Sequence, residues 1–351
     1  MEMKTIKILS LFDGISIARQ AIINCGIDIE KYYASEIDKY AIQVAQKNFP
    51  DTIQVGSVVD LKGEDFKDID LIIGGSPCQD LSIAKKNREG LSGARSGLFY
   101  EYVRILKEVK PKYFILENVN SMPKEAKQMI TEELGVEPIM INAALVSAQN
   151  RKRLFWVGKL VGDKYEQVKM ELPEDQGILL KDILESDVDE KYFLNDSYIK
   201  NLNRESYGAK GSIANKNKKT KTLTASMGCG GGNGIYVSRP SGAKTVLYLT
   251  NSKGKTYQQD LLQTTEGKCR TIPSGTHGST PHLLKTIMPD NRIRKLTPIE
   301  CERLQSLPDG FTEKGLNENN EEVLISNTQR YKALGNGFNC KVIEHIIKNL
   351  K

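Results

Sequence analysis

The chain has 351 residues, of which 39% are hydrophobic and 27% are charged, and its formal net charge is +6. These values are ordinary for a globular protein, and the length suits one large domain with a smaller one. No apolar run reaches membrane-spanning length, and the first residues lead into a strand-like segment rather than a signal peptide. The sequence therefore argues against a membrane partner, and we expect a cytoplasmic protein.

Strand-like apolar runs alternate with helical patterns from residue 1 to about 160. Strands are expected at Ile6–Phe12, Tyr32–Ile37, Ile53–Val55, Leu71–Gly75 and Tyr113–Glu117. Helices are expected at Ile15–Cys25, Lys39–Asn48, Leu98–Val109 and Lys124–Leu134, before an antiparallel ending formed by Pro138–Val146 and Leu154–Gly158. This order predicts an α/β fold with a doubly wound, mostly parallel sheet, in which ligands bind at the carboxyl ends of the strands.

Residues from about 165 to 295 are different, being rich in Gly, Ser, Thr, Asn and Lys with short β-like pieces. Residues 201–295 hold 16 Lys and Arg against four acids, a net +12, so the rest of the chain carries −6. The composition predicts a loop-rich second domain. Its charge fits either a solvated surface or a surface that binds a polyanion such as nucleic acid. An amphipathic helix near Cys340–Leu350 ends the chain.

Two features at strand ends favour a cofactor that carries adenosine. Phe12-Asp13-Gly14 follows the first strand and opens a helix, where glycine permits a close backbone approach and free N–H groups face a ligand. Glu36 ends the second strand, where a carboxylate can hold ribose hydroxyls. Each feature alone also fits an ordinary turn or a solvated acid, but the two together favour the cofactor.

A cysteine and a glutamate are expected on adjacent strand ends. Ser76-Pro77-Cys78-Gln79 follows the fourth strand, and Glu117 lies at the end of the fifth. A lone cysteine is usually a buried structural thiol, but the neighbouring Lys85 and Arg88 favour thiolate here. The six cysteines form no CxxC pair, so we expect neither disulfides nor a metal site, and three histidines leave few candidates for a Cys-His pair.

This pair of residues suits chemistry on a cytosine ring. Addition of a thiolate at C6, with an acid partner at N3, makes C5 able to accept a methyl group. The base must leave the stacked duplex for this reaction, so a basic second domain that holds DNA fits the same hypothesis.

Seven blocks of the chain, in order, resemble the cytosine-C5 DNA methyltransferase family of bacterial and phage type. They are Phe12-Asp13-Gly14, Glu36, Ser76-Pro77-Cys78-Gln79, Glu117-Asn118-Val119, Gln149-Asn150-Arg151-Lys152-Arg153, Arg294–Glu300 with Arg303-Leu304-Gln305, and Gln329–Lys332 with Gly335-Asn336. The resemblance extends from Ile8 almost to the C-terminus. It implies a Rossmann-like catalytic domain of residues 1–165 plus 328–351 and a target-recognition domain of residues 166–327.

The resemblance also implies roles for individual residues. Cys78 would attack C6, and Glu117 would hold N3 and the amino edge. Arg151 and Arg153 would contact the target base or phosphate and steady the active-site loop. Residues expected to bind S-adenosylmethionine are Phe12, Asp13, Gly14, Glu36, Ile37, Ser57, Val58, Pro77, Leu98, Asn336 and Gly337. Residues expected to bind DNA are Gln79, Ser82, Lys85, Arg88, Gln149, Thr222, Leu223, Arg270, Thr271 and Arg294.

The sequence departs from the family pattern at a few positions. Ser16 replaces a second glycine, Ser57 stands where the family commonly has an acid, and Gly337-Phe338 replaces a small residue followed by valine. The Thr-Leu pair of the family's recognition region matches either Thr222-Leu223 or Thr271-Ile272, and we favour the first.

Three other functions are weighed against this one. An RNA cytosine methyltransferase of the same fold is the nearest rival, although the large basic insertion favours duplex DNA. A catalytically silent DNA-binding relative is disfavoured by the intact Cys78 and Glu117, and an amino-group methyltransferase by the lack of an Asn/Asp-Pro-Pro-Tyr/Phe block. We expect a monomer that binds double-stranded DNA, with a cognate restriction endonuclease as a further partner.

Overall fold

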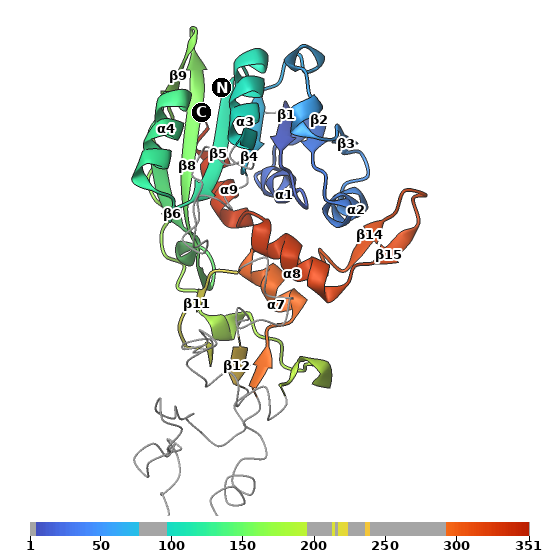
Figure 1. Cartoon of the computed structure of the whole chain (residues 1–351). Coiled ribbons are helices and arrows are strands. Elements are labelled where there is room, and N and C mark those ends of the chain that lie inside the picture. Colours follow the sequence, from blue (N-terminus) through green and yellow to red (C-terminus); the bar gives the residue numbers. More distant parts are fainter. Residues whose placement is uncertain are drawn as a thin grey trace, which may run out of the picture.

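An eight-stranded sheet forms the centre of the protein (Figure 1), in a computed structural model that describes residues 5–76, 97–194, 213–214, 217–223, 236–238 and 293–350. The strand order is β3-β2-β1-β4-β5-β8-β6, with β9 paired to β8. The strands are β1 (Thr5–Leu11), β2 (Asp28–Ser35), β3 (Ile53–Gln54), β4 (Leu71–Gly74), β5 (Tyr113–Val119), β6 (Pro138–Asn142), β8 (Lys152–Val161) and β9 (Lys164–Gln167). Strands β1 to β5 run parallel, and β8 is antiparallel to β5, β6 and β9. The predicted mixed, mostly parallel sheet and its antiparallel ending are confirmed.

Helices cover both faces of the sheet, because alternate residues of each central strand enter two different cores. In β1, Ile6 and Ile8 lie in one core, and Leu9 and Leu11 lie in the other. The first core is closed by α1 (Ile17–Asn24), α2 (Lys39–Asn48) and α9 (Cys340–Lys348). The second is closed by α3 (Gly97–Val109) and α4 (Lys124–Leu134). The amphipathic patterns in the sequence predicted all five helices to within two residues at each end.

The segment after residue 293 contains elements that the sequence did not predict. They are α7 (Pro298–Leu304), the hairpin of β14 (Lys314–Leu316) and β15 (Glu322–Leu324), and α8 (Asn327–Asn336). Cys301, Leu304 and Phe311 are buried in the same core as Ile8 of the central sheet. Residues before the predicted boundary at 328 therefore share a core with the central sheet, as do Leu180 and Leu223. The division into two domains stays a prediction.

Short elements complete the part of the chain that is described. Strand β7 (Gln149–Asn150) pairs in parallel with β11 (Thr220–Lys221), and β12 (Tyr236–Ser238) lies between β10 (Ile213–Ala214) and β13 (Ile293–Lys295). Single turns of 3-10 helix lie at Val58–Asp60, Gly63–Asp65, Ala143–Leu145, Leu180–Asp182 and Glu190–Tyr192. Within these described ranges, no helix has the length and apolar character needed to cross a membrane.

Candidate active site

The strand order places the candidate site at the carboxyl ends of β1 and β4. Strand β1 pairs with β2 on one side and with β4 on the other, so the chain changes direction across the sheet between β1 and β4. Such a switch point leaves a crevice outside the strand ends, where open α/β sheets bind ligands. The turn after β1 and the loop after β4 both begin at this crevice.

The turn after β1 has an unusual backbone. Phe12, Gly14 and Ser16 all have a positive φ, at 57°, 62° and 57°. A Cβ on Gly14 would meet no atom within 4 Å, so there is open space beside this residue. Glycine is favoured there because it adopts a positive φ without strain. Ser16 immediately precedes α1, so the turn places the start of that helix at the crevice.

The Asp13 side chain links this turn to β2 through hydrogen bonds. Its side chain is buried and accepts hydrogen bonds from the Tyr32 hydroxyl, at 2.7 Å, and from the Ser16 hydroxyl. Burial raises the pKa of the Asp13 carboxyl from 3.8 to about 6, although these hydrogen bonds oppose the shift. Asp13 was predicted to bind the cofactor. In the structure its side chain instead contacts Ser16 and Tyr32.

Glu36, at the end of β2, is fixed by main-chain donors. One carboxylate oxygen accepts from Gly14 N at 2.8 Å, and the other accepts from Ile37 N and Asp38 N at 2.7 and 2.8 Å. A carboxylate has about four acceptor positions, so one remains for a ligand hydroxyl. Ile37 is 76% exposed beside it, and the pair forms a polar and an apolar contact surface next to the glycine turn.

The other predicted cofactor residues have varied surroundings. Ser57 caps the turn Val58–Asp60, and the Val58 side chain is buried in the core behind the sheet. Leu98, in the first turn of α3, is half-buried against that core. Asn336 is exposed at the end of α8. Pro77 lies outside the described residues.

Helix α8 and the glycine after it contact the N-terminal ends of α1 and α2. A Cβ on Gly337 would come within 2.6 Å of Ile17 Cδ1 in the first turn of α1, so glycine permits this close packing. Lys332 in α8 forms an ion pair with Asp38, two residues after Glu36, at 2.5 Å. The C-terminal segment therefore borders the crevice beside both Gly14 and Glu36.

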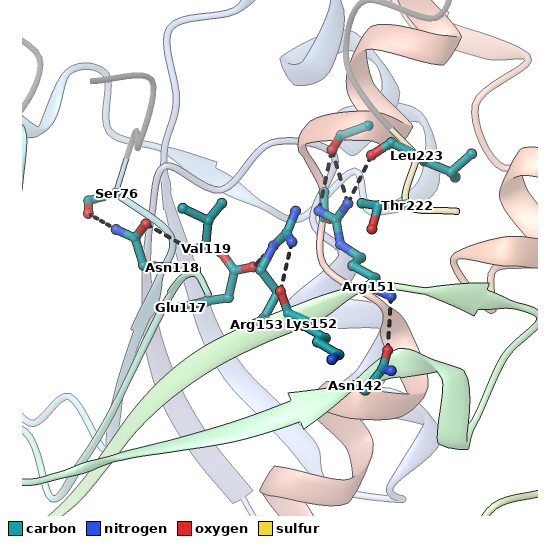
Figure 2. A network of polar contacts seen from close by, with 12 residues as sticks. Ser76, Glu117, Asn118, Val119, Asn142, Arg151, Lys152, Arg153, Thr222 and Leu223 are labelled. Atoms are coloured by element: carbon teal, nitrogen blue, oxygen red, sulfur yellow. Dashed lines mark hydrogen bonds and ion pairs between the residues drawn. The ribbon is translucent and has the colours of Figure 1, made fainter. Parts of the chain in front are cut away.

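Glu117 and Arg153 form an ion pair at the same edge of the sheet (Figure 2). Arg153 Nε lies 2.7 Å from Glu117 Oε1, and the two side chains are 17% and 13% exposed. A Cβ on Gly75, just after β4, would lie 3.2 Å from Glu117 Oε2 and 3.3 Å from the Phe338 ring. The carboxylate is therefore held between Arg153 and the end of β4.

The last described residue after β4 is Ser76, two positions before Cys78. Ser76 Oγ accepts a hydrogen bond from the Asn118 side chain at 3.3 Å, and both residues are buried (Figure 2). This contact ties the start of the cysteine loop to the residue after Glu117. Several predicted residues lie outside the described ranges, namely Cys78, Gln79, Ser82, Lys85, Arg88, Arg270 and Thr271.

Gln149 and Arg151 hold the Thr222-Leu223 pair. Gln149 accepts a hydrogen bond from Leu223 N at 3.2 Å, and Arg151 donates to Leu223 O at 3.2 Å. The Thr222 hydroxyl donates to the carbonyl of Asn150, beside the β7–β11 pairing. Thr222-Leu223 is therefore docked on the predicted motif. Thr271-Ile272 lies outside the described residues, so the preference for Thr222-Leu223 stays a prediction.

A family model described as C-5 cytosine-specific DNA methylase matches residues 6–351. The chain belongs to this family. It is 29% identical to the orphan methyltransferase M.SPRI of Bacillus phage SPR, over 99% of this chain and 98% of that protein. It is 28% identical to the type II methyltransferase M.NlaX of Neisseria lactamica, over 98% of this chain and 96% of that protein.

Solved structures share the fold at lower sequence identity. The methyltransferase EhMeth of Entamoeba histolytica superposes with a TM-score of 0.68 at 18% identity, covering 99% of this chain and 98% of that one. The Dnmt2 methyltransferase of S. pombe superposes with a TM-score of 0.64 at 17% identity, covering 98% and 97%. The predictions of a Rossmann-like methyltransferase fold and of a DNA cytosine methyltransferase are confirmed.

Two residues predicted to bind DNA in this methyltransferase are buried. Arg294 is 4% exposed, and its guanidinium donates to both carboxylate oxygens of Glu300 at 2.8 and 2.7 Å. Gln149 is fully buried, with its amide nitrogen on Leu304 O and Gln305. Both placements argue against direct DNA contact by these side chains, since Gln149 instead accepts from the Leu223 N–H and Arg294 is paired with Glu300.

Two residues at this site, Asn118 and Phe338, had no role predicted from the sequence. Asn118 anchors Ser76, and Phe338 packs its ring beside Gly75 and Glu117. Both lie next to motif residues in the sequence, and Phe338 departs from the family's usual valine. The replacement of valine by the larger phenylalanine was the one feature of the sequence that pointed to this side chain.

Proposed function

We propose that this methyltransferase transfers a methyl group from S-adenosylmethionine to C5 of a cytosine flipped out of a specific duplex DNA sequence, through a covalent bond between Cys78 and C6. The observation that carries this proposal is the Glu117 carboxylate, which is paired with Arg153 and lies beside the end of β4, where the chain leads to Cys78. This arrangement supports one nucleophile and one carboxylate acting on the same ring.

The residues of the chain would act in a defined order. The Cys78 thiolate forms a bond to C6, and the electrons of the C5–C6 double bond move to C5, which accepts the methyl group. Glu117 contacts N3 and the amino edge, where charge develops during the addition, and Arg153 fixes the carboxylate in place. A solvent water then accepts the C5 proton, the electrons of that C–H bond restore the C5–C6 double bond, and the C6–S bond breaks to release the Cys78 thiolate. The target base reaches these groups only after it leaves the duplex stack.

S-adenosylmethionine would bind at the carboxyl ends of β1 and β2, beside the Gly14 turn and Glu36. The open space beside Gly14 accommodates a close ligand, the free acceptor position on Glu36 suits a ribose hydroxyl, and the exposed Ile37 suits an apolar contact with adenine. Phe12, Leu98, Asn336, Ser57 and Pro77 complete the proposed set. When bound, the cofactor supplies the methyl group from its sulfonium centre.

Duplex DNA is the proposed substrate, because residues 201–295 carry a net charge of +12. Gln79, Ser82, Lys85 and Arg88 would contact phosphates near the nucleophile, and Thr222, Arg270 and Thr271 would serve recognition. We further propose a cytoplasmic monomer. A cognate restriction endonuclease is supported by type II relatives such as M.NlaX, whereas M.SPRI is named an orphan methyltransferase.

Bisulfite sequencing of host DNA, with and without the expressed protein, tests the reaction and locates its target. The proposal predicts new 5-methylcytosine at one sequence, and its absence would refute the proposal. Transfer of labelled methyl groups to duplex DNA and to tRNA tests the substrate class. Activity on RNA alone would support the RNA methyltransferase instead.

A further inference from the structure

We propose that Arg151 is a positioning residue that couples the cofactor side of the site to the recognition segment, defined as residues 217–223. The proposal rests on the proposed function, since it assigns one side chain the link between the two binding events of that reaction. It departs from the expectation that Arg151 contacts the base or phosphate.

The guanidinium of Arg151 joins two segments that are far apart in the sequence. Nη1 donates to Leu223 O at 3.2 Å and to Gly335 O at 3.3 Å, and Nη2 donates to Gly335 O at 3.3 Å and to Gly337 O at 2.7 Å. The residue is 3% exposed. A planar guanidinium suits this task, because its fixed fork of donors reaches several carbonyls at once.

Each of the two segments leads to a different ligand. Gly337 packs against Ile17, in the first turn of the helix that follows the Gly14 turn. On the other side, the N–H of Leu223 donates to Gln149. The Leu223 carbonyl accepts from Arg151 (Figure 2), so the main chain of Leu223 is held on both sides of its Cα. A shift of the C-terminal segment on cofactor binding would therefore reach the recognition segment through Arg151.

The recognition segment also has anchors that do not depend on Arg151. Lys219 Nζ lies 3.1 Å from Asp175 and 3.2 Å from Ile178 O, and Thr220 N donates to Ala148 O at 2.7 Å. A change at Arg151 should therefore alter the position of Leu223 without detaching the whole segment. This separation makes the coupling measurable in a folded variant.

The test measures DNA affinity with and without bound S-adenosylhomocysteine, on a duplex that carries the site located by bisulfite sequencing. In the wild type, the cofactor product should raise DNA affinity by at least about fivefold, the lower range of measured couplings between sites. Arg151→Lys keeps the charge but loses the fork, and Arg151→Met loses both. The coupling factor should fall towards one in Arg151→Met and to an intermediate value in Arg151→Lys, while cofactor affinity without DNA changes less than about twofold.

Arg303→Met is the matched control. Arg303 also donates to a main-chain carbonyl, that of Ile183, at 3.0 Å, and its other polar partner is Asp309. Among the described residues its side chain makes no hydrogen bond to residues 335–337 or to Leu223. This variant should keep the wild-type coupling factor. Hydrogen exchange adds a readout independent of DNA, because the Leu223 amide should exchange faster in Arg151→Lys than in the wild type.

The outcomes separate two failures. A wild type that neither binds the cofactor nor methylates DNA would refute the proposed function. A wild type that does both, with an unchanged coupling factor in Arg151→Lys, would overturn the role of Arg151. Equal losses of DNA affinity with and without S-adenosylhomocysteine would indicate a simple DNA contact and would overturn it as well. If Arg151→Met does not fold, Arg151→Lys and the exchange rates decide.

Discussion

Arg153 Nε lies 2.7 Å from Glu117 Oε1, and this ion pair joins two antiparallel neighbours at the edge of the sheet where the reaction is proposed to occur. Both side chains are largely buried, so solvent screens the pair less than it screens surface pairs. The arginine therefore fixes the carboxylate in one orientation before any substrate binds, and preorganised groups of this kind contribute most to catalysis.

Glu117→Gln should reduce methyl transfer by about 100-fold or more, because a positioned proton-handling group typically contributes 10²–10⁴-fold. Steady-state transfer of labelled methyl groups to duplex DNA measures the effect. Glu101→Gln is the matched control, since Glu101 pairs with Arg104 at 2.7 Å in α3. Equal losses in the two variants would argue against a role for Glu117 in the reaction.

Gly74→Ala should lower the stability of the protein, whereas Gly75→Ala should lower its activity. A Cβ at Gly74 would lie 2.6 Å from the Leu11 carbonyl of β1, so this change should destabilise the protein by about 1–3 kcal/mol. A Cβ at Gly75 would press only on Glu117 and Phe338, at 3.2 and 3.3 Å. We expect Gly75→Ala to keep nearly normal stability and lose about tenfold in turnover through the displaced carboxylate.

Thermal unfolding and turnover, measured on both glycine variants, check this pair of predictions. A Gly75→Ala enzyme with wild-type turnover would show that the carboxylate tolerates displacement. A stable Gly74→Ala protein would show that β1 and β4 can separate without loss.

Asp13 should make the stability of the protein depend on pH. Burial raises the pKa of this carboxyl from 3.8 to about 6, so the native state binds the proton more tightly than the unfolded chain. The resulting stabilisation is complete below pH 3.8 and is lost as the pH rises through 6. Its size, from the difference between these pKa values, is about 3 kcal/mol.

Asp13→Asn removes the titrating carboxyl group and keeps a side chain of nearly the same size and shape. Urea unfolding of both proteins between pH 5 and 7.5 should show the wild type gaining stability relative to Asp13→Asn as the pH falls, with other carboxyl groups cancelling in the comparison. A constant difference between the two proteins across this range would show that Asp13 does not titrate there.

The sequence predicted the sheet and its helices because apolar periodicity reports burial directly. Strand β2 begins at Asp28, four residues earlier than predicted, because Asp28, Glu30 and Lys31 are polar and exposed although this stretch still pairs with β1. Helix α8 was missed because its apolar face is narrow, and its buried residues include Arg330 and Gly335. Backbone pairing and polar burial of this kind leave little trace in a hydrophobic pattern.

The site was predictable in its residues but not in all their contacts. The positions of Glu36 and Glu117 at strand ends follow from the order of strands. The burial of Arg151 and Arg294 does not, because their partners are carbonyls near residue 335 and a carboxylate whose position depends on how the C-terminal segment folds back. Arginines in a basic protein suggest DNA contacts, and only tertiary structure distinguishes them from arginines that hold the fold.

A covalent trap with 5-fluorocytosine tests the central claim most directly. Fluorine at C5 cannot leave as a proton, so an enzyme that bonds to C6 and transfers the methyl group stays attached to the duplex. Wild-type protein with S-adenosylmethionine and such a duplex should give a complex that survives a denaturing gel, with the DNA attached to the peptide that contains Cys78. Cys78→Ser should give none. An equal yield of complex from Cys78→Ser, or methylation of ordinary cytosine by that variant, would contradict Cys78 as the nucleophile.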